Sequence, residues 1–284
     1  MTSAHLLLIA PFESLGFMRT ALVACLALAV LNGAVGPLLL MRRMTLDGNV
    51  LAHAVMPGAA IGFLYAGPSA MWLSLGGLAS GLVVAAMAGL IAGARAWRDA
   101  ALVAFYLVAL SLGVMLVAWR GSNVDVVRVL FGTVLAIDRP MLLQIAVVAS
   151  VVLAVIAALY RPLAVGAVDP AFLRSLGVRT PYGAIFVILV VLSLVASFQA
   201  FGTLLAIGPM LLPAAASRAW KLGVPASMAL ATAFGFAASV GGLLLSYHAN
   251  LPSGPAIVLA GGVLFGLSVV ASGTLFIDRA ATRD

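Results

Sequence analysis

Long stretches without a charged residue dominate this chain and constrain its fold more than any other feature. A helix needs about 20 apolar residues to cross a bilayer, so the longest stretches hold two spans each. Across the whole sequence 64% of residues are hydrophobic and only 8% are charged, far below the roughly 25% charged of soluble domains. The alternation of a membrane barrel is missing. The charge-free stretches are 20–41, 50–94, 100–119, 140–160, 182–217 and 222–277.

These lengths predict an all-α fold, a polytopic integral membrane helical bundle with about eight or nine transmembrane helices. The stretch 182–217 holds one and a half to two of them. One domain over residues 1–284 is expected, because the polar segments 120–139 and 161–181 are too short to fold alone. The formal charge of +7 does not indicate a nucleic-acid partner, because the basic residues lie at span ends and form no soluble patch.

The distribution of lysine and arginine predicts the orientation. If the N-terminus is outside and every span crosses, eleven basic residues fall on one side and four on the other. The richer side is the cytoplasmic one by the positive-inside rule, which also places the C-terminus in the cytoplasm. This arrangement needs 203–216 to cross back, as a full span or a short broken one. The eleven are Arg42, Arg43, Arg95, Arg98, Arg161, Arg174, Arg179, Arg218, Lys221, Arg279 and Arg283; the four are Arg19, Arg120, Arg128 and Arg139.

One histidine lies well inside a predicted span. On a helix, Asn49, His53 and Pro57 stack on one face at four-residue spacing. Polar residues inside a bilayer are costly and often line pathways, and imidazole is a common ligand of zinc and related ions. A packing role and a role in a metal pathway are equally compatible with the residues alone.

The stretch 199–218 is predicted to be a broken helix. It contains Gly202, Gly208, Pro209 and Pro213 and no charge before Arg218. Backbone freed at membrane depth is tolerated where it is packed in protein or lines a cavity, and discontinuous helices often mark transport pathways. We favour a pathway over a simple proline kink.

A short helix is predicted between two spans at residues 169–177. Asp169 suits the N-cap, Pro170 the first helical position and Gly177 the C′ position. The apolar Phe172, Leu173 and Leu176 then share a face. Such a helix lies on the membrane surface or docks on a partner, and the residues alone favour the surface position.

Small residues and the single cysteine are interpreted as packing features. Glycines recur at four-residue spacing, which lets helix backbones approach closely. Cys25 falls inside the first span and is interpreted as a small apolar packing residue. The glycine pairs are Gly58 with Gly62, Gly77 with Gly81, Gly89 with Gly93, and Gly262 with Gly266.

Together these segments resemble the metal-ion permease family of ABC importers, which takes up zinc, manganese or iron. The most specific match runs from Gly36-Pro37 through Arg42-Arg43 to Gly48-Asn49-x-Leu51-Ala52-His53-Ala54. It is similar to the family's arginine pair followed by its G-D-x-x-[SA]-H-A element. Weaker matches are Leu130-Phe131-Gly132, Asp169-Pro170 with Gly177, 211–218 and Pro252-Ser253-Gly254-Pro255.

The resemblance implies a permease homodimer in the bacterial plasma (inner) membrane. It further implies a separate cytoplasmic ATPase, an extracytoplasmic metal-binding protein and a coupling role for Asp169, Phe172, Leu173, Leu176 and Gly177. His53 carries over as the metal-pathway histidine. Asn49 stands where the family usually has an aspartate, and Thr133 where an acid often follows Phe-Gly. An amide oxygen can coordinate a cation but does not neutralise it.

Three other functions compete with a zinc or manganese permease. A siderophore or cobalamin-like ABC permease has related helices but does not explain the arginine pair and His53 element. A secondary transporter would need acids within the spans to couple an ion gradient, and the spans contain none. An enzyme is not expected, because the sequence has no HExxH, no paired acids and no Ser/His/Asp constellation. No ATP-binding G-x-x-x-x-G-K-[ST] motif is present either, and no cofactor is expected.

Overall fold

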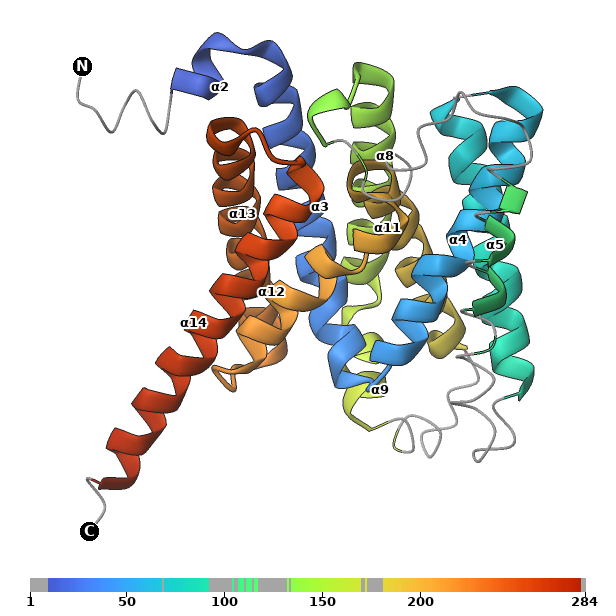
Figure 1. Cartoon of the computed structure of the whole chain (residues 1–284). Helices are drawn as coiled ribbons and strands as arrows, with labels where there is room; N and C mark the ends of the chain where they lie inside the picture. The colour runs from blue at the N-terminus through green and yellow to red at the C-terminus, as the bar shows by residue number, and fades with distance from the viewer. Residues whose placement is uncertain are drawn as a thin grey trace.

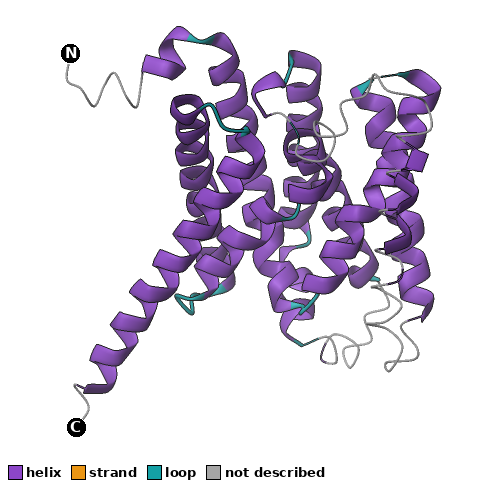
Figure 2. Cartoon of the chain, viewed as in Figure 1, coloured by secondary structure: helices purple, strands orange, loops and turns teal. Residues whose placement is uncertain are grey.

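Every regular element in the described part of the chain is helical (Figures 1 and 2). The computed structural model describes residues 10–67, 69–91, 104, 107–109, 111–113, 115–116, 132, 134–169, 172 and 181–281. The helices are α2 (Ala10–Ser14), α3 (Gly16–Met41), α4 (Thr45–Ala66), α5 (Ala70–Ile91), η1 (Val134–Ala136), α8 (Arg139–Ala158), α9 (Tyr160–Val168), α11 (Tyr182–Leu205), α12 (Gly208–Arg218), α13 (Val224–Ala249) and α14 (Ser253–Ala281).

Seven of the described helices are long and apolar enough to cross a membrane. The prediction of a polytopic helical bundle is therefore confirmed. The expected span over 100–119 lies largely outside the described residues, so eight or nine remains an approximate count. The seven are α3, α4, α5, α8, α11, α13 and α14.

The bundle has three central helices with the others arranged around them. In their most apolar windows α3, α11 and α4 are 72%, 67% and 61% buried, whereas α5, α8, α13 and α14 are 17% to 33% buried. The central α3 packs against α13, α12 and α8, and α4 packs against α5 and α11. Figure 1 shows the same order, with α12, α13 and α14 on the left of α3 and α4 and α5 on the right.

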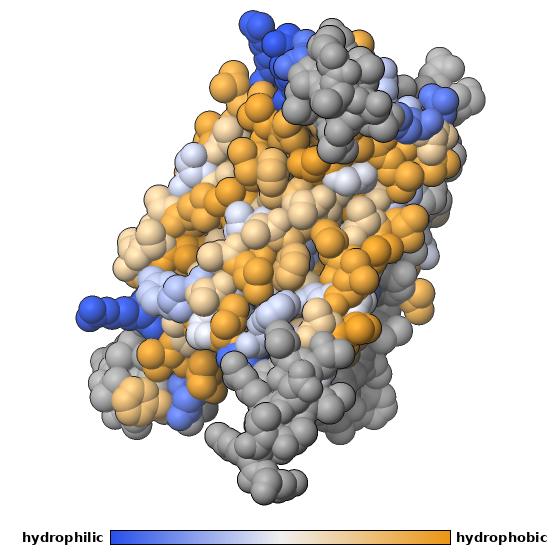
Figure 3. Space-filling model, turned by 90° about the vertical axis from the view of Figure 1, so that its left-hand side faces the viewer, coloured by the Kyte–Doolittle hydropathy of each residue, from blue (hydrophilic) through white to orange (hydrophobic). Residues whose placement is uncertain are grey.

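The outer surface is that of a protein solvated by lipid. On the face drawn in Figure 3, apolar residues cover the middle, and hydrophilic residues gather toward the upper and lower ends. Leu259, Val263 and Leu267 of α14 are 56% to 61% exposed. Large apolar side chains exposed in this number would be costly in water, and hydrocarbon removes that cost.

The predicted broken helix near 199–218 is confirmed. Gly202 interrupts α11 with φ 75° and ψ 175°, a conformation that is essentially restricted to glycine. The following α12 has 11 residues, so it is only about 16 Å long and covers about half of a bilayer core. Residues 182–217 therefore form one full span and one half-length helix.

A second glycine with positive φ lies against this break. Gly132 has φ 65°, and a Cβ atom at this position would overlap the backbone of Ala200, Phe201 and Gly202. The segment at Gly132 therefore crosses the α11 break at a distance that only glycine permits.

The glycine pairs do not all act as predicted. Gly58 and Gly62 lie against the backbone of Gly76 and Trp72 in α5, which confirms a close helix contact. Gly77 and Gly81 likewise pack on valine side chains of α4 and α11. By contrast, Cβ atoms at Gly262 and Gly266 of α14 would meet no atom within 4 Å. The close helix contact expected at these two glycines is therefore not made within the single chain, because both face away from the bundle.

Candidate functional site

His53 lies in the buried interior of α4. Its side chain is 4% exposed, and it lies eight residues after the start of the helix, which is roughly 12 Å along the axis. Asn49 is half-buried one turn closer to that start. The predicted stacking of Asn49 and His53 along one helix is therefore present in the structure.

The faces of α4 show which way His53 points. Ser80 Oγ of α5 donates a hydrogen bond to the Ala54 carbonyl at 2.7 Å, and Gly58 touches the α5 backbone, so α5 covers the face of Ala54 and Gly58. A Cβ atom at Gly113 would lie 2.6 Å from Met56 Cγ. Met56 shares a face with His53 at i, i+3. The histidine face is thus turned toward the segment that contains Gly113.

The start of α4 also packs near the broken helix. A Cβ atom at Gly48 would lie 3.0 Å from Leu39 Cδ2 and 3.3 Å from Ile207 Cδ1. Gly48 therefore lies between the end of α3 and the junction of α11 with α12. Two segments predicted separately from the sequence, the Asn49–His53 element and the broken helix, are neighbours in the fold.

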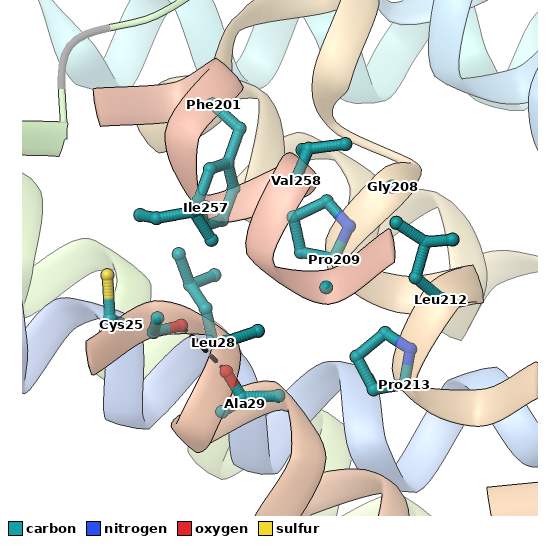
Figure 4. A pocket seen from close by; sticks show the side chains of 14 residues that line it. Cys25, Leu28, Ala29, Phe201, Gly208, Pro209, Leu212, Pro213, Ile257 and Val258 are labelled. Atoms are coloured by element: carbon teal, nitrogen blue, oxygen red, sulfur yellow. Dashed lines mark hydrogen bonds between the residues drawn. The ribbon is translucent and has the colours of Figure 1, made fainter. Parts of the chain in front are cut away.

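The other side of the break is a packing surface. A cavity of about 10 Å³ lies between α3, α11, α12, α13 and α14, and Figure 4 shows Phe201, Pro209 and Pro213 around it. That volume holds about one water molecule. The lining is apolar apart from Cys25 and Ser239. Cys25 is fully buried, as expected of a packing residue, and this side of the break offers no ligand set for a cation.

Two polar contacts inside the bundle were not predicted from the sequence. Asn32 Nδ2 of α3 donates to Ser197 Oγ of α11 at 3.0 Å, and Gln199 Nε2 of α11 donates to Ser74 Oγ of α5. Polar pairs of this kind hold membrane helices together. Their members lie 165 and 125 residues apart in the chain, so local spacing carries no signal for them.

The segment after α9 begins as predicted. The Asp169 carboxylate accepts a hydrogen bond from the Phe172 N–H at 3.0 Å, which is the N-cap contact expected of it. Phe172 is helical and 51% exposed. The other predicted members of this helix, Leu173, Leu176 and Gly177, lie outside the described residues.

Arg42 connects this end of the bundle to the start of α4. Its Nη2 donates to the Leu163 carbonyl of α9 at 3.3 Å, and its guanidinium lies 4.3 Å from the centre of the Phe186 ring in α11. Burial lowers the pKa of the Arg42 guanidinium from its ordinary value, although an arginine stays charged at neutral pH. The turn between α3 and α4 is thereby fixed to the helix that leads into Asp169.

The described residues do not bring together a set of metal ligands. They contain no group of three or more His, Cys, Asp or Glu side chains able to hold an ion. His53 and Asn49 are near each other on one helix, while His248 lies in the last turn of α13, where it is exposed.

The chain is similar to known membrane permeases along most of its length. The model of the ABC 3 transport family matches residues 14–272. The chain is 32% identical over 255 residues to the manganese import system permease protein ScaB of Streptococcus parasanguinis, with 89% of each chain covered. It is 30% identical over 260 residues to the manganese transport system membrane protein MntC of Halalkalibacterium halodurans, which covers 90% of this chain and 87% of the relative.

A solved structure, PsaBC from Streptococcus pneumoniae in complex with Fab, matches with a TM-score of 0.83 at 27% identity. The match covers 92% of this chain and 94% of that one. Fold, family model and relatives agree over almost the whole sequence. This chain is a multi-pass membrane permease that belongs to the ABC 3 transport family.

Proposed function

We propose that this permease imports a divalent transition-metal ion, and that manganese is its substrate. The observation that carries this proposal is His53, buried inside a central spanning helix with Asn49 one turn away. Relatives at 30% and 32% identity are named as manganese permeases, which favours manganese over zinc.

The two side chains supply one nitrogen and one oxygen donor. Carbonyl and water oxygens suit manganese, and imidazole suits zinc and its neighbours. A transport site must release its ion, so an incomplete protein ligand set completed by water is compatible with passage. A second copy of the chain would add another such pair, and we propose that the permease is a homodimer.

The energy source is proposed to be a separate cytoplasmic ATPase, docked on the helix that starts at Asp169. Phe172, Leu173 and Leu176 are its proposed apolar anchors, with Gly177 at its end. The 51% exposure of Phe172 supports docking, because a buried phenylalanine would have no surface to offer.

The orientation proposed is N-terminus outside and C-terminus in the cytoplasm of a bacterial plasma membrane. The ends of α3, α9 and α12 meet at one end of the bundle, since Arg43, Val168 and Arg218 line one cavity there. These basic ends belong to the side that is rich in arginine and lysine, which supports a cytoplasmic assignment. An extracytoplasmic binding protein would deliver the ion at the opposite end.

The test is uptake of radioactive manganese by cells that express the permease with its ATPase and binding protein. We expect His53→Ala to lower the initial rate by about tenfold or more, because an imidazole ligand is lost. His53→Gln keeps a polar side chain of similar size and should recover less than half of the rate. Met56→Leu, one turn away on the same face, is the matched packing control and should transport as the unmodified protein does.

Expression of every variant is matched by immunoblotting of membranes. Equal uptake by all variants would make His53 a packing residue and remove the basis of this proposal. Excess unlabelled zinc and manganese, added in separate arms, establish which ion the complex prefers.

A further inference from the structure

A cavity of about 420 Å³ lies at the end of the bundle where α3, α9 and α12 terminate. In Figure 1 this is the lower end of the molecule. Its described lining residues include no His, Cys, Asp or Glu side chain, and no step of the proposed transport uses this cavity. Its chemistry is set by three cations, Arg43, Arg218 and Lys221, which line it from the α3–α4 turn, the last residue of α12 and the α12–α13 turn.

The charged side chains that line this cavity are basic. None of its described lining residues is acidic, although Asp169 follows the lining residue Val168 in sequence. Arg42 points elsewhere, to Leu163 and Phe186, so the two neighbouring arginines have different functions. Several cations converging on one concavity attract an anion, and guanidinium groups bind phosphate oxygens in pairs.

Two of the three cations have a backbone conformation that is unusual for residues other than glycine. Arg43 and Lys221 have φ of 56° and 50°, in the left-handed region that non-glycine residues adopt at a cost. Arg43 follows the end of α3 with its N–H bonded to the Leu40 carbonyl, a place where glycine is the usual residue. A cation at a position whose backbone favours glycine points to a use for the side chain itself.

The inner wall is apolar. Pro37, Leu40 and Ala214 line the cavity and precede Arg43 and Arg218 along α3 and α12, and Pro37 and Leu40 belong to the spanning part of α3. A soluble anion would gain nothing from this wall. A molecule with an anionic head and an apolar chain fits both parts at once.

We propose that this cavity binds an anionic phospholipid. Arg43, Arg218 and Lys221 hold the phosphate, and the first carbons of an acyl chain lie along Pro37, Leu40 and Ala214. Basic pockets at the ends of membrane helices select such headgroups. The proposal does not depend on which metal is transported, so it can fail while the transport function stands.

The test measures lipid binding to the full chain, purified with its ATPase in a neutral detergent. Native mass spectrometry follows the titration with dioleoyl phosphatidylglycerol. Dioleoyl phosphatidylcholine and inorganic phosphate form two comparison arms. We expect phosphatidylglycerol to bind in preference to both, and its affinity to fall as salt is added.

Two variants remove charge at the cavity. Arg43→Gly places glycine where the backbone favours it, so the fold is retained while the cation is lost, and Arg218→Gln removes a second charge. Each is expected to weaken phosphatidylglycerol binding about fivefold, the effect of one basic residue near an anionic headgroup. Asn250→Gly makes the same backbone change at the third non-glycine residue with positive φ among those described. Arg161→Gln removes an exposed charge of α9 outside the cavity. Both controls should bind as the unmodified protein does.

Unchanged phosphatidylglycerol affinity in Arg43→Gly and Arg218→Gln would overturn the proposal. So would equal binding of phosphatidylcholine. Binding of inorganic phosphate as tight as that of the lipid would make the cavity a soluble-anion site. Loss of the ATPase from both variants with lipid binding intact would make it a protein contact instead.

Discussion

The polar side chains within the spans differ in their roles. Asn32 with Ser197, and Gln199 with Ser74, hydrogen-bond across helices and tie α11 to α3 and α5. They are accounted for by helix packing. Asn49 belongs to neither pair and shares its helix with His53 one turn away.

Asn49→Asp is expected to tighten manganese binding by about tenfold, equivalent to about 1.4 kcal/mol. A carboxylate adds a negative charge next to a divalent ion in a site of low effective dielectric, where Coulomb terms are large. The apparent Kd of the purified complex for manganese, measured by isothermal titration calorimetry, checks this.

The matched control is Asn49→Leu, which removes the oxygen at similar volume and should weaken binding. If Asp, Asn and Leu at position 49 give the same affinity, this side chain does not contact the ion.

At the scale of the element, the break in α11 and the chain that crosses it form one unit. Gly202 provides the bend, and Gly132 allows a second backbone to lie against it. The half-length α12 then continues from the bend with prolines in its first turn and interior.

Gly132→Ala is expected to destabilise the protein by about 2 kcal/mol or more, because a Cβ atom there meets backbone and the φ of 65° disfavours alanine. Thermal unfolding of the detergent-solubilised complex measures this loss as a lower Tm. Gly262→Ala is the control, since α14 has open space at that residue and alanine is the better helix former by about 1 kcal/mol. A Tm of Gly132→Ala equal to that of the unmodified protein would contradict the close crossing.

The helix predicted over 169–177 carries a second prediction at this scale. Replacing Phe172 and Leu173 together with aspartate should reduce ATPase retained on the purified permease to less than about a tenth, because a few apolar anchors supply most of the energy of such an interface. Ser175→Asp adds a charge to the same segment without removing an anchor and should retain the ATPase. Retention and transport at unmodified levels in the double variant would leave this helix lying on the membrane surface.

For the whole molecule, orientation is the property most open to a direct test. A reporter fused after Arg98 or Gly177 should be cytoplasmic, and one inserted near Ser122 or Ala249 should be external, because the positive-inside rule places the basic ends in the cytoplasm. Alkaline phosphatase and green fluorescent protein fusions give opposite signals for the two sides. The reverse pattern would contradict the proposed orientation. It would also rule out docking of a cytoplasmic ATPase on the segment that follows Asp169.

The sequence predicts the class and span positions of this fold because lipid requires continuous apolar helices. It also predicts the break near Gly202 and the N-cap at Asp169, since both depend on local backbone chemistry. It cannot predict which distant segments meet. The Asn32–Ser197 pair, the crossing at Gly132 and the outward direction of Gly262 all depend on tertiary packing between remote parts of the chain. The same holds for the basic cavity, which brings Arg43 of the α3–α4 turn to Arg218 and Lys221 at the end of α12.

The crossing at Gly132 has a mechanical consequence. Straightening α11 through Gly202 would change the path of a backbone on which residue 132 already rests. The bend therefore cannot open as a free hinge while that contact is in place. During a transport cycle, α11 and α12 would therefore tilt together as one rigid unit, or the segment at Gly132 would first have to move away from the bend. In the first case, a rotation of α11 turns α12 through the same angle.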